Sequence, residues 1–205
     1  DLSKLLNIKY PIIQGGMAIR LSTAPLAAAV ANEGGIGLIA ASGMGLDELR
    51  KEIRMARELT GGKGIIGINA MVAARQFLDL ITTAAEEGID LIVAGAGFSR
   101  DIFAVGKKYG VEVVPIVSSA RLAQTAEKLG ASAVVVEGTE AGGHLGTQQS
   151  IKEILPEVIA AVNIPVIAAG GAVDGNDVAD LLKLGANGVQ MGSRFAASEE
   201  SNAAP

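Results

Sequence analysis

Apolar and polar positions follow a repeating order along this chain. Short runs rich in Val, Ile and Gly are each followed by turn residues and then by a segment with helical spacing, which is typical of βα units. Eight such runs predict eight strands. They cover residues 10–17, 35–42, 64–71, 91–97, 112–119, 133–140, 165–171 and 188–195.

The segments between these strands carry apolar residues at i, i+3, i+4 and i+7, as expected for helices with one buried face. The pattern is clearest in residues 151–162, is repeated in 77–84 and is weaker in 102–109. Strand starts lie 21 to 32 residues apart, which fits short loops and no inserted domain.

Repeated βα units form either an open sheet or a closed barrel. An open dinucleotide-binding sheet should carry G-x-G-x-x-G after its first strand, but the nearest matches, at 43–48 and 95–100, lack the third glycine and follow later strands. Closure also leaves no exposed edge on so apolar a sheet. We therefore predict one α/β domain over residues 1–205, a TIM-type (β/α)8 barrel.

The chain ends soon after the last predicted strand. The residues after Phe195 are too few for a loop and a full eighth helix, although Ser198, Glu199 and Glu200 resemble the first turn of a helix. We expect a barrel truncated after strand 8, with the C-terminal helix and a lid segment missing and the natural sequence continuing past Pro205.

Composition narrows the class of protein. With 205 residues, 49% of them apolar, the chain can bury a single core, and the scattered net charge of −5 gives no support to nucleic-acid or membrane binding. The absence of Cys excludes disulfides and thiol chemistry. No apolar run approaches the ~18 residues of a membrane helix, and the first residues do not resemble a leader. We expect a cytoplasmic protein.

Two glycine turns late in the chain are candidates for phosphate binding. Barrels of this type form their active sites at the C-terminal ends of the strands, and the loops after strands 7 and 8 commonly hold phosphate. Gly170, Gly171, Gly192 and Ser193 lie in those loops, where glycine lets the backbone approach a ligand. The alternative is that these glycines only permit tight turns.

His144 is the sole histidine and lies in a glycine-rich loop after strand 6. There it can donate a proton to a substrate, or it can be a bystander. Gln14 and Asn69 end their strands and either bind a ring edge or satisfy loop backbone. Met17 either covers a flat ring or fills the core. Glu137 and Glu140 either bind a hydroxyl group or a cation, or they face solvent.

Several chemistries are excluded by missing residues. No lysine lies near the C-terminal end of a predicted strand, as a Schiff-base aldolase requires. One histidine without cysteine cannot build the usual zinc site, so no metal is expected. G-x-S-x-G and the phosphate-binding G-x-x-x-x-G-K-[ST] are both absent.

Five motifs in order, at 11–18, 67–69, 137–146, 165–171 and 190–195, resemble the nitronate monooxygenase (2-nitropropane dioxygenase) family, which includes FMN-dependent type II enoyl-[acyl-carrier-protein] reductases. The resemblance implies that FMN is the cofactor and that His144 is the active-site histidine. Relatives place the phosphate on Gly171, Gly192 and Ser193. The implied flavin contacts are Gly15, Gly16, Met17, Asn69, Glu137, Gly142, Gln190 and Met191.

The resemblance implies an oxidoreductase with a small-molecule substrate. A homodimer is a possible assembly. Our first assignment is oxidation of alkyl nitronates with O2. The alternative is reduction of an enoyl thioester with NAD(P)H as co-substrate, which the segment 115–119 and the apolar Ile116 favour. Two further alternatives remain open. One is a non-catalytic barrel that binds a phosphate ligand, and the other is a barrel enzyme that acts on a sugar phosphate.

Overall fold

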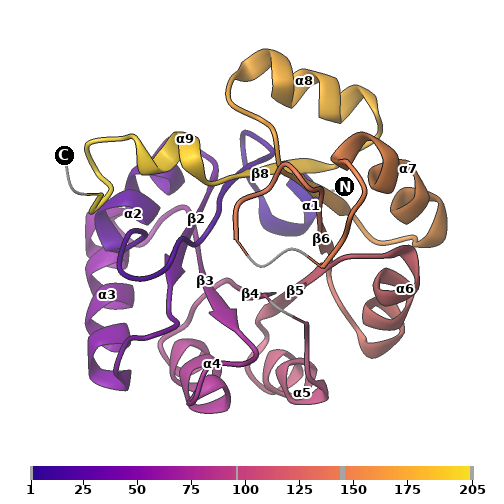
Figure 1. Cartoon of the computed structure of the whole chain (residues 1–205). Helices are drawn as coiled ribbons and strands as arrows, with labels where there is room; N and C mark the ends of the chain where they lie inside the picture. Colours follow the sequence, from indigo (N-terminus) through magenta and orange to yellow (C-terminus); the bar gives the residue numbers. More distant parts are fainter. Residues whose placement is uncertain (1, 96, 144–145, 204–205) are drawn as a thin grey trace.

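The computed structural model describes residues 2–95, 97–143 and 146–203. All eight predicted strands are present and parallel, and they close into a barrel in chain order. Closure comes from pairing of the first and last strands, with Ile13 opposite Gln190 and Gln14 opposite Met191. The fold is therefore the predicted TIM-type barrel, and helices surround its strands in Figure 1.

The strands are shorter than the apolar runs that predict them. They are β1 (Ile12–Gln14), β2 (Ile36–Ala40), β3 (Ile65–Met71), β4 (Leu91–Gly95), β5 (Glu112–Val117), β6 (Val134–Glu137), β7 (Val166–Ala169) and β8 (Gly188–Met191). Among the described residues, most of those trimmed from the predicted C-terminal ends lie in loops at one end of the barrel, whereas residues 193–195 form a short helix.

Helices follow each strand on the outside of the barrel. They are α2 (Ala24–Asn32), α3 (Leu46–Leu59), α4 (Phe77–Glu86), α5 (Arg100–Tyr109), α6 (Ala120–Leu129), α7 (Ile151–Ala161), α8 (Gly175–Lys183) and the short α9 (Ser193–Ala196), after an initial α1 (Leu2–Leu6). The periodicity in 151–162 is confirmed, because Ile151, Ile154, Leu155 and Val158 are buried. None of the helices in the described ranges is long and apolar enough to span a bilayer.

The end of the chain differs from the expectation. Strand β8 stops at Met191, because Gly192 turns the chain out of the sheet, and Ser193 begins α9 within the predicted strand 188–195. Ser198 begins no helix in the described part of the chain. Instead, the Asn202 amide donates to Arg20 O (3.0 Å) and Thr23 Oγ1 (3.1 Å), which holds this segment across the loop after β1.

The interior of the barrel is closed at one end and open at the other. Leu2 and Leu6 of α1 pack with inward side chains such as Leu38, Val93 and Val135, and so fill the N-terminal end. At the C-terminal end the inward positions carry small or polar residues, among them Asn69, Gly95, Glu137 and Gln190. The packing therefore leaves a cavity at the end where catalytic residues of such barrels gather.

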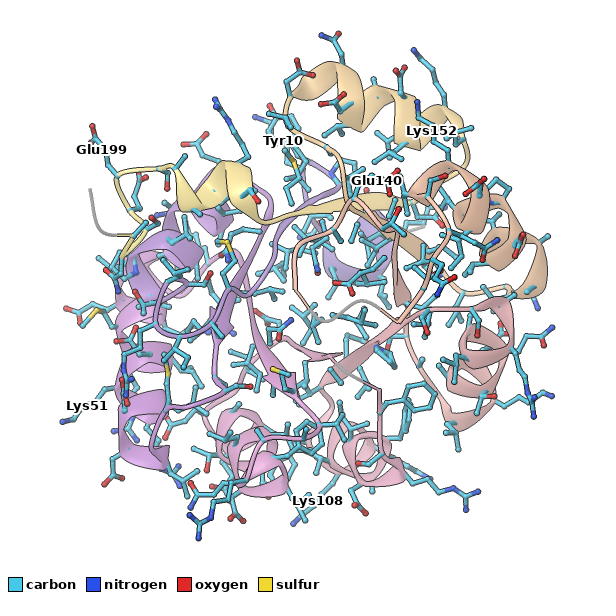
Figure 2. The ribbon with its side chains drawn as sticks, viewed as in Figure 1. Tyr10, Lys51, Lys108, Glu140, Lys152 and Glu199 are labelled. Carbon is cyan, nitrogen blue, oxygen red and sulfur yellow. The ribbon has the colours of Figure 1, made fainter. Side chains whose placement is uncertain are left out.

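Charged side chains on the helices mostly face solvent. Figure 2 shows Lys51 and Lys108 projecting from the outer faces of α3 and α5, whereas Glu140 lies beside the loops around the centre of the ring. The outer face of α3 is bound to α4 by ion pairs from Arg50 and Arg54 to Glu87. These pairs lie at the surface, although Glu87 is only 12% exposed, and surface pairs of this kind contribute about 0–1 kcal/mol each.

Candidate functional site

A cavity of about 590 Å³ opens at the C-terminal end of the barrel, within the ~300–1,000 Å³ range of small-molecule sites. Every residue predicted above to bind cofactor lines it. These residues are Gly15, Gly16, Met17, Asn69, Glu137, Gly142, Gly170, Gly171, Gln190, Met191, Gly192 and Ser193. The predicted catalytic His144 lies outside the described residues, two positions after Gly142.

The two glycine turns lie side by side on the cavity wall because β7 and β8 are paired strands. Gly170 and Gly171 have φ of 117° and 77°, a left-handed conformation that favours glycine. The backbone N–H groups of Gly171, Ala172, Ser193 and Arg194 donate to no acceptor within the described residues. Free donors on neighbouring turns of this kind suit an anionic oxygen.

The two helices beside these turns differ in what they offer an anion. Asp174 Oδ1 accepts from the N–H groups of Asn176 (2.8 Å) and Asp177 (3.1 Å), so the first turn of α8 is capped by its own side chain. These two backbone bonds, that of Asp177 first, lower the pKa of the Asp174 carboxyl. The start of α9 carries no such cap. Any helix contribution to anion binding therefore comes from α9.

Sequence reasoning missed Arg194. It is exposed, lines the cavity directly after the Gly192–Ser193 turn, and is the one basic side chain among the lining residues that the structure describes. A guanidinium at this position adds positive charge to the free N–H groups of the turn. Its place in the sequence, next to a predicted phosphate turn, was the available signal.

The floor of the cavity carries a buried hydrogen-bond acceptor that has no partner within the described residues. Gln190 is 8% exposed, and its Oε1 has no hydrogen-bond partner among the described residues. Glu137 makes no ion pair within the same ranges, and burial raises the pKa of its carboxyl. Unsatisfied buried polar atoms are uncommon in native proteins. Gln190 Oε1 could therefore accept a hydrogen bond from a ligand with a donor group.

Glu137 provides a prediction for the ligand-free chain. Its carboxylate is disfavoured by burial, so the folded state binds a proton more readily than the unfolded state. Below the ordinary pKa of the unfolded chain, burial of this carboxyl does not destabilise the fold. The destabilisation grows as the pH rises from that ordinary pKa to the raised pKa of the folded chain, and it is complete above the raised pKa. We expect Glu137→Gln to raise the melting temperature near pH 7 and the difference to vanish toward pH ~4.

Thermal unfolding scans of both proteins over that pH range would measure this difference. Glu199→Gln, at an exposed carboxyl, is the matched control and should change the melting temperature little at any pH. A melting temperature for Glu137→Gln that falls below that of the native chain at neutral pH would show that the carboxylate is stabilising.

Gln14 does not face the cavity, although its position at the end of a strand made it a candidate ligand-binding residue. It is fully buried, and Oε1 accepts from Leu38 N (3.1 Å) while Nε2 donates to Gly15 O (2.6 Å) and Ser22 Oγ (3.0 Å). It satisfies loop backbone and does not line the cavity. Asn69, on an inward position of β3, does line it.

Glu140 is a structural residue in part. Its Oε2 accepts from Ile151 N (2.9 Å) at the first residue of α7, so it fixes the long loop between β6 and α7. Ser42, which sequence reasoning also missed, lines the cavity and accepts from Met71 N (2.8 Å). No group of three His, Cys, Asp or Glu side chains in the described ranges is arranged to hold a metal ion.

Fold and site together define a class: a (β/α)8 barrel whose cavity is lined by glycine turns after β7 and β8 and has a polar floor. Comparison with known proteins assigns the chain to one family within that class. The model of the nitronate monooxygenase family matches residues 1–92 and 66–205. The chain belongs to this family, whose members are in general FMN-dependent oxidoreductases.

Three relatives illustrate the range of the family. FabK from Thermotoga maritima, an enoyl-ACP reductase, is 41% identical with a TM-score of 0.94 over 100% of this chain and 68% of its own. A probable nitronate monooxygenase of Staphylococcus aureus is 34% identical over 98% of this chain and 69% of its own. A hydroxy-methyl-oxo-octahydro-indene-carboxyl-CoA dehydrogenase of Rhodococcus jostii is 35% identical over 98% of this chain and 56% of its own. The chain thus spans about half the length of that last relative.

Proposed function

We propose that this chain is the FMN-binding barrel of an oxidoreductase. The observation that supports this proposal is that free backbone N–H groups of the turns after β7 and β8 line the same cavity as the unpartnered Gln190 Oε1. Such a site suits a ligand with a phosphate at one end and N–H or hydroxyl donors along the rest. FMN has this composition, and when bound it supplies hydride and single-electron transfer.

The residues present fit FMN in separate roles. Gly171, Gly192, Ser193 and Arg194 would hold the phosphate through backbone N–H groups and one guanidinium. Glu137 would accept hydrogen bonds from hydroxyl groups. Gly15, Gly16, Met17, Asn69, Gly142, Gly170, Gln190 and Met191 would surround the rest of the cofactor. We assign His144 the role of proton donor to the substrate.

Two substrate classes are candidates, and each is favoured by a comparison. Oxidation of an alkyl nitronate with O2 is favoured by the Staphylococcus aureus relative, which is named a probable nitronate monooxygenase. An acyl thioester is favoured by the 41% identity to FabK and by the carboxyl-CoA dehydrogenase of Rhodococcus jostii. Ile116, an apolar residue at the end of β5 that lines the cavity, suits the second class.

An anaerobic titration of the FMN-loaded protein would test both the cofactor and the substrate class that we propose. Bleaching of the flavin by NADH or NADPH, with reoxidation by an enoyl thioester, would select the reductase. Direct bleaching by propyl nitronate would select the monooxygenase. A colourless protein that cannot be reconstituted with FMN would overturn the cofactor assignment and leave the phosphate-ligand-binding barrel.

A further inference from the structure

The loop after β1 lines the cavity with four consecutive residues, 15–18, of which Gly15, Gly16 and Met17 form the turn that leaves the sheet. Strand β1 is short, and its last backbone bond to β8 is from Gly15 N to Met191 O (2.8 Å). Beyond that bond, the turn leaves the sheet, and two of its three residues are glycines with high backbone freedom. Something other than the ladder must therefore fix its position.

Two buried side chains supply that fixation. Gln14 and Ser22 are each 0% exposed, and Gln14 Nε2 donates to Ser22 Oγ (3.0 Å) and to Gly15 O (2.6 Å). Ser22 Oγ in turn accepts from Met17 N (2.9 Å) and lies 3.4 Å from Gly15 O. The amide and hydroxyl hydrogens are thus all used, and the first and last residues of the turn are both held.

This pair of residues, the Gln14–Ser22 brace, is itself anchored on the barrel. Gln14 Oε1 accepts from Leu38 N (3.1 Å) in β2, and Ser22 O accepts from Ala40 N (2.9 Å) in the same strand. The brace therefore ties the turn to β2, the neighbouring strand in the sheet.

The turn has little room to move on its cavity side. A Cβ built on Gly15 would lie 3.2 Å from Gln190 Cγ, and one built on Gly16 would overlap Asn69 Cβ. Gly15 and Gly16 thus sit directly against two residues of the cavity floor. Neither Gln14 nor Ser22 lines the cavity, so they act on a ligand only through the turn.

We propose that Gln14 and Ser22 are positioning residues that hold the Gly15–Met17 turn as a preformed wall for the cofactor. The inference rests on the proposed function for the identity of that ligand. The brace itself is a property of the ligand-free chain. A preformed wall spares the ligand the entropic cost of ordering two glycines when it binds.

The test compares Ser22→Ala with Thr60→Val, which removes a buried hydroxyl (7% exposed, bonded to Arg57 O at 3.2 Å) from the loop after α3. We expect the two variants to lose similar thermal stability. Only Ser22→Ala should weaken FMN binding, by about tenfold in a flavin-fluorescence titration, and it should also speed amide hydrogen exchange at Met17. Ser22→Thr, which keeps the hydroxyl, should restore both.

Two outcomes would overturn the proposal. One is native FMN affinity in Ser22→Ala together with faster exchange at Met17, because the turn would then be free without consequence for binding. The other is rapid exchange at Met17 in the native, ligand-free chain, which needs no variant to fold. If the native chain binds no FMN but protects Met17, the proposed function fails while the brace stands.

Discussion

Gly16→Ala should weaken FMN binding by about 10- to 100-fold, because an overpacked contact costs about 1–3 kcal/mol and each 1.4 kcal/mol is tenfold in affinity. A Cβ at this position overlaps Asn69 Cβ and lies 3.1 Å from Asn69 Cγ. Asn69 Cβ is attached to the backbone of β3, so it cannot rotate away as the end of a long side chain would. The turn after β1 must instead move away from β3, and the Gln14–Ser22 brace resists that movement.

Equilibrium titration of the apoprotein with FMN would measure the loss. Gly175→Ala is the matched control, because a Cβ on this first residue of α8 meets nothing within 4 Å. That variant should bind FMN as the native chain does. Equal affinities of Gly16→Ala and Gly175→Ala would show that the contact between the turn and Asn69 does not shape the binding site.

His144→Ala should lower turnover by roughly 10²–10⁴-fold, the contribution of a positioned general acid. The reasoning combines sequence and structure. His144 is the sole histidine, and the preceding residues Glu140, Ala141, Gly142 and Gly143 all line the cavity. Arg194 is the one basic side chain that lines the cavity in the described ranges, and a guanidinium does not give up a proton near neutral pH.

Steady-state kinetics with the substrate class selected by the flavin titration would measure this effect, with FMN content determined in parallel. We expect the variant to retain FMN, because the proposed phosphate contacts lie in other loops. Native turnover in His144→Ala would remove the residue from the mechanism. An absence of turnover in the native protein, with FMN bound, would instead favour a binding barrel.

The sequence by itself determined the repeating architecture and the general place of the site. Runs such as 133–140 and 165–171 mark strands and their turns because backbone geometry is set locally. Gly170 and Gly171 occupy the left-handed conformations that glycine favours. Once the barrel closes, all strand ends meet at one mouth, so turns far apart in sequence were predicted to share it, and the family resemblance added Gln190 to the same site.

The tertiary structure decided which polar residues face the ligand. Strands of a parallel barrel are buried on both faces, so their apolar runs do not reveal which positions point inward. Gln14 and Asn69 were therefore equivalent candidates. Pairing of Ile13 with Gln190 in the closed barrel leaves Gln14 on the other side of β1, in the brace. Asp174 capping α8 and Arg194 joining the cavity depend likewise on how distant strands and loops pack together, which no local pattern specifies.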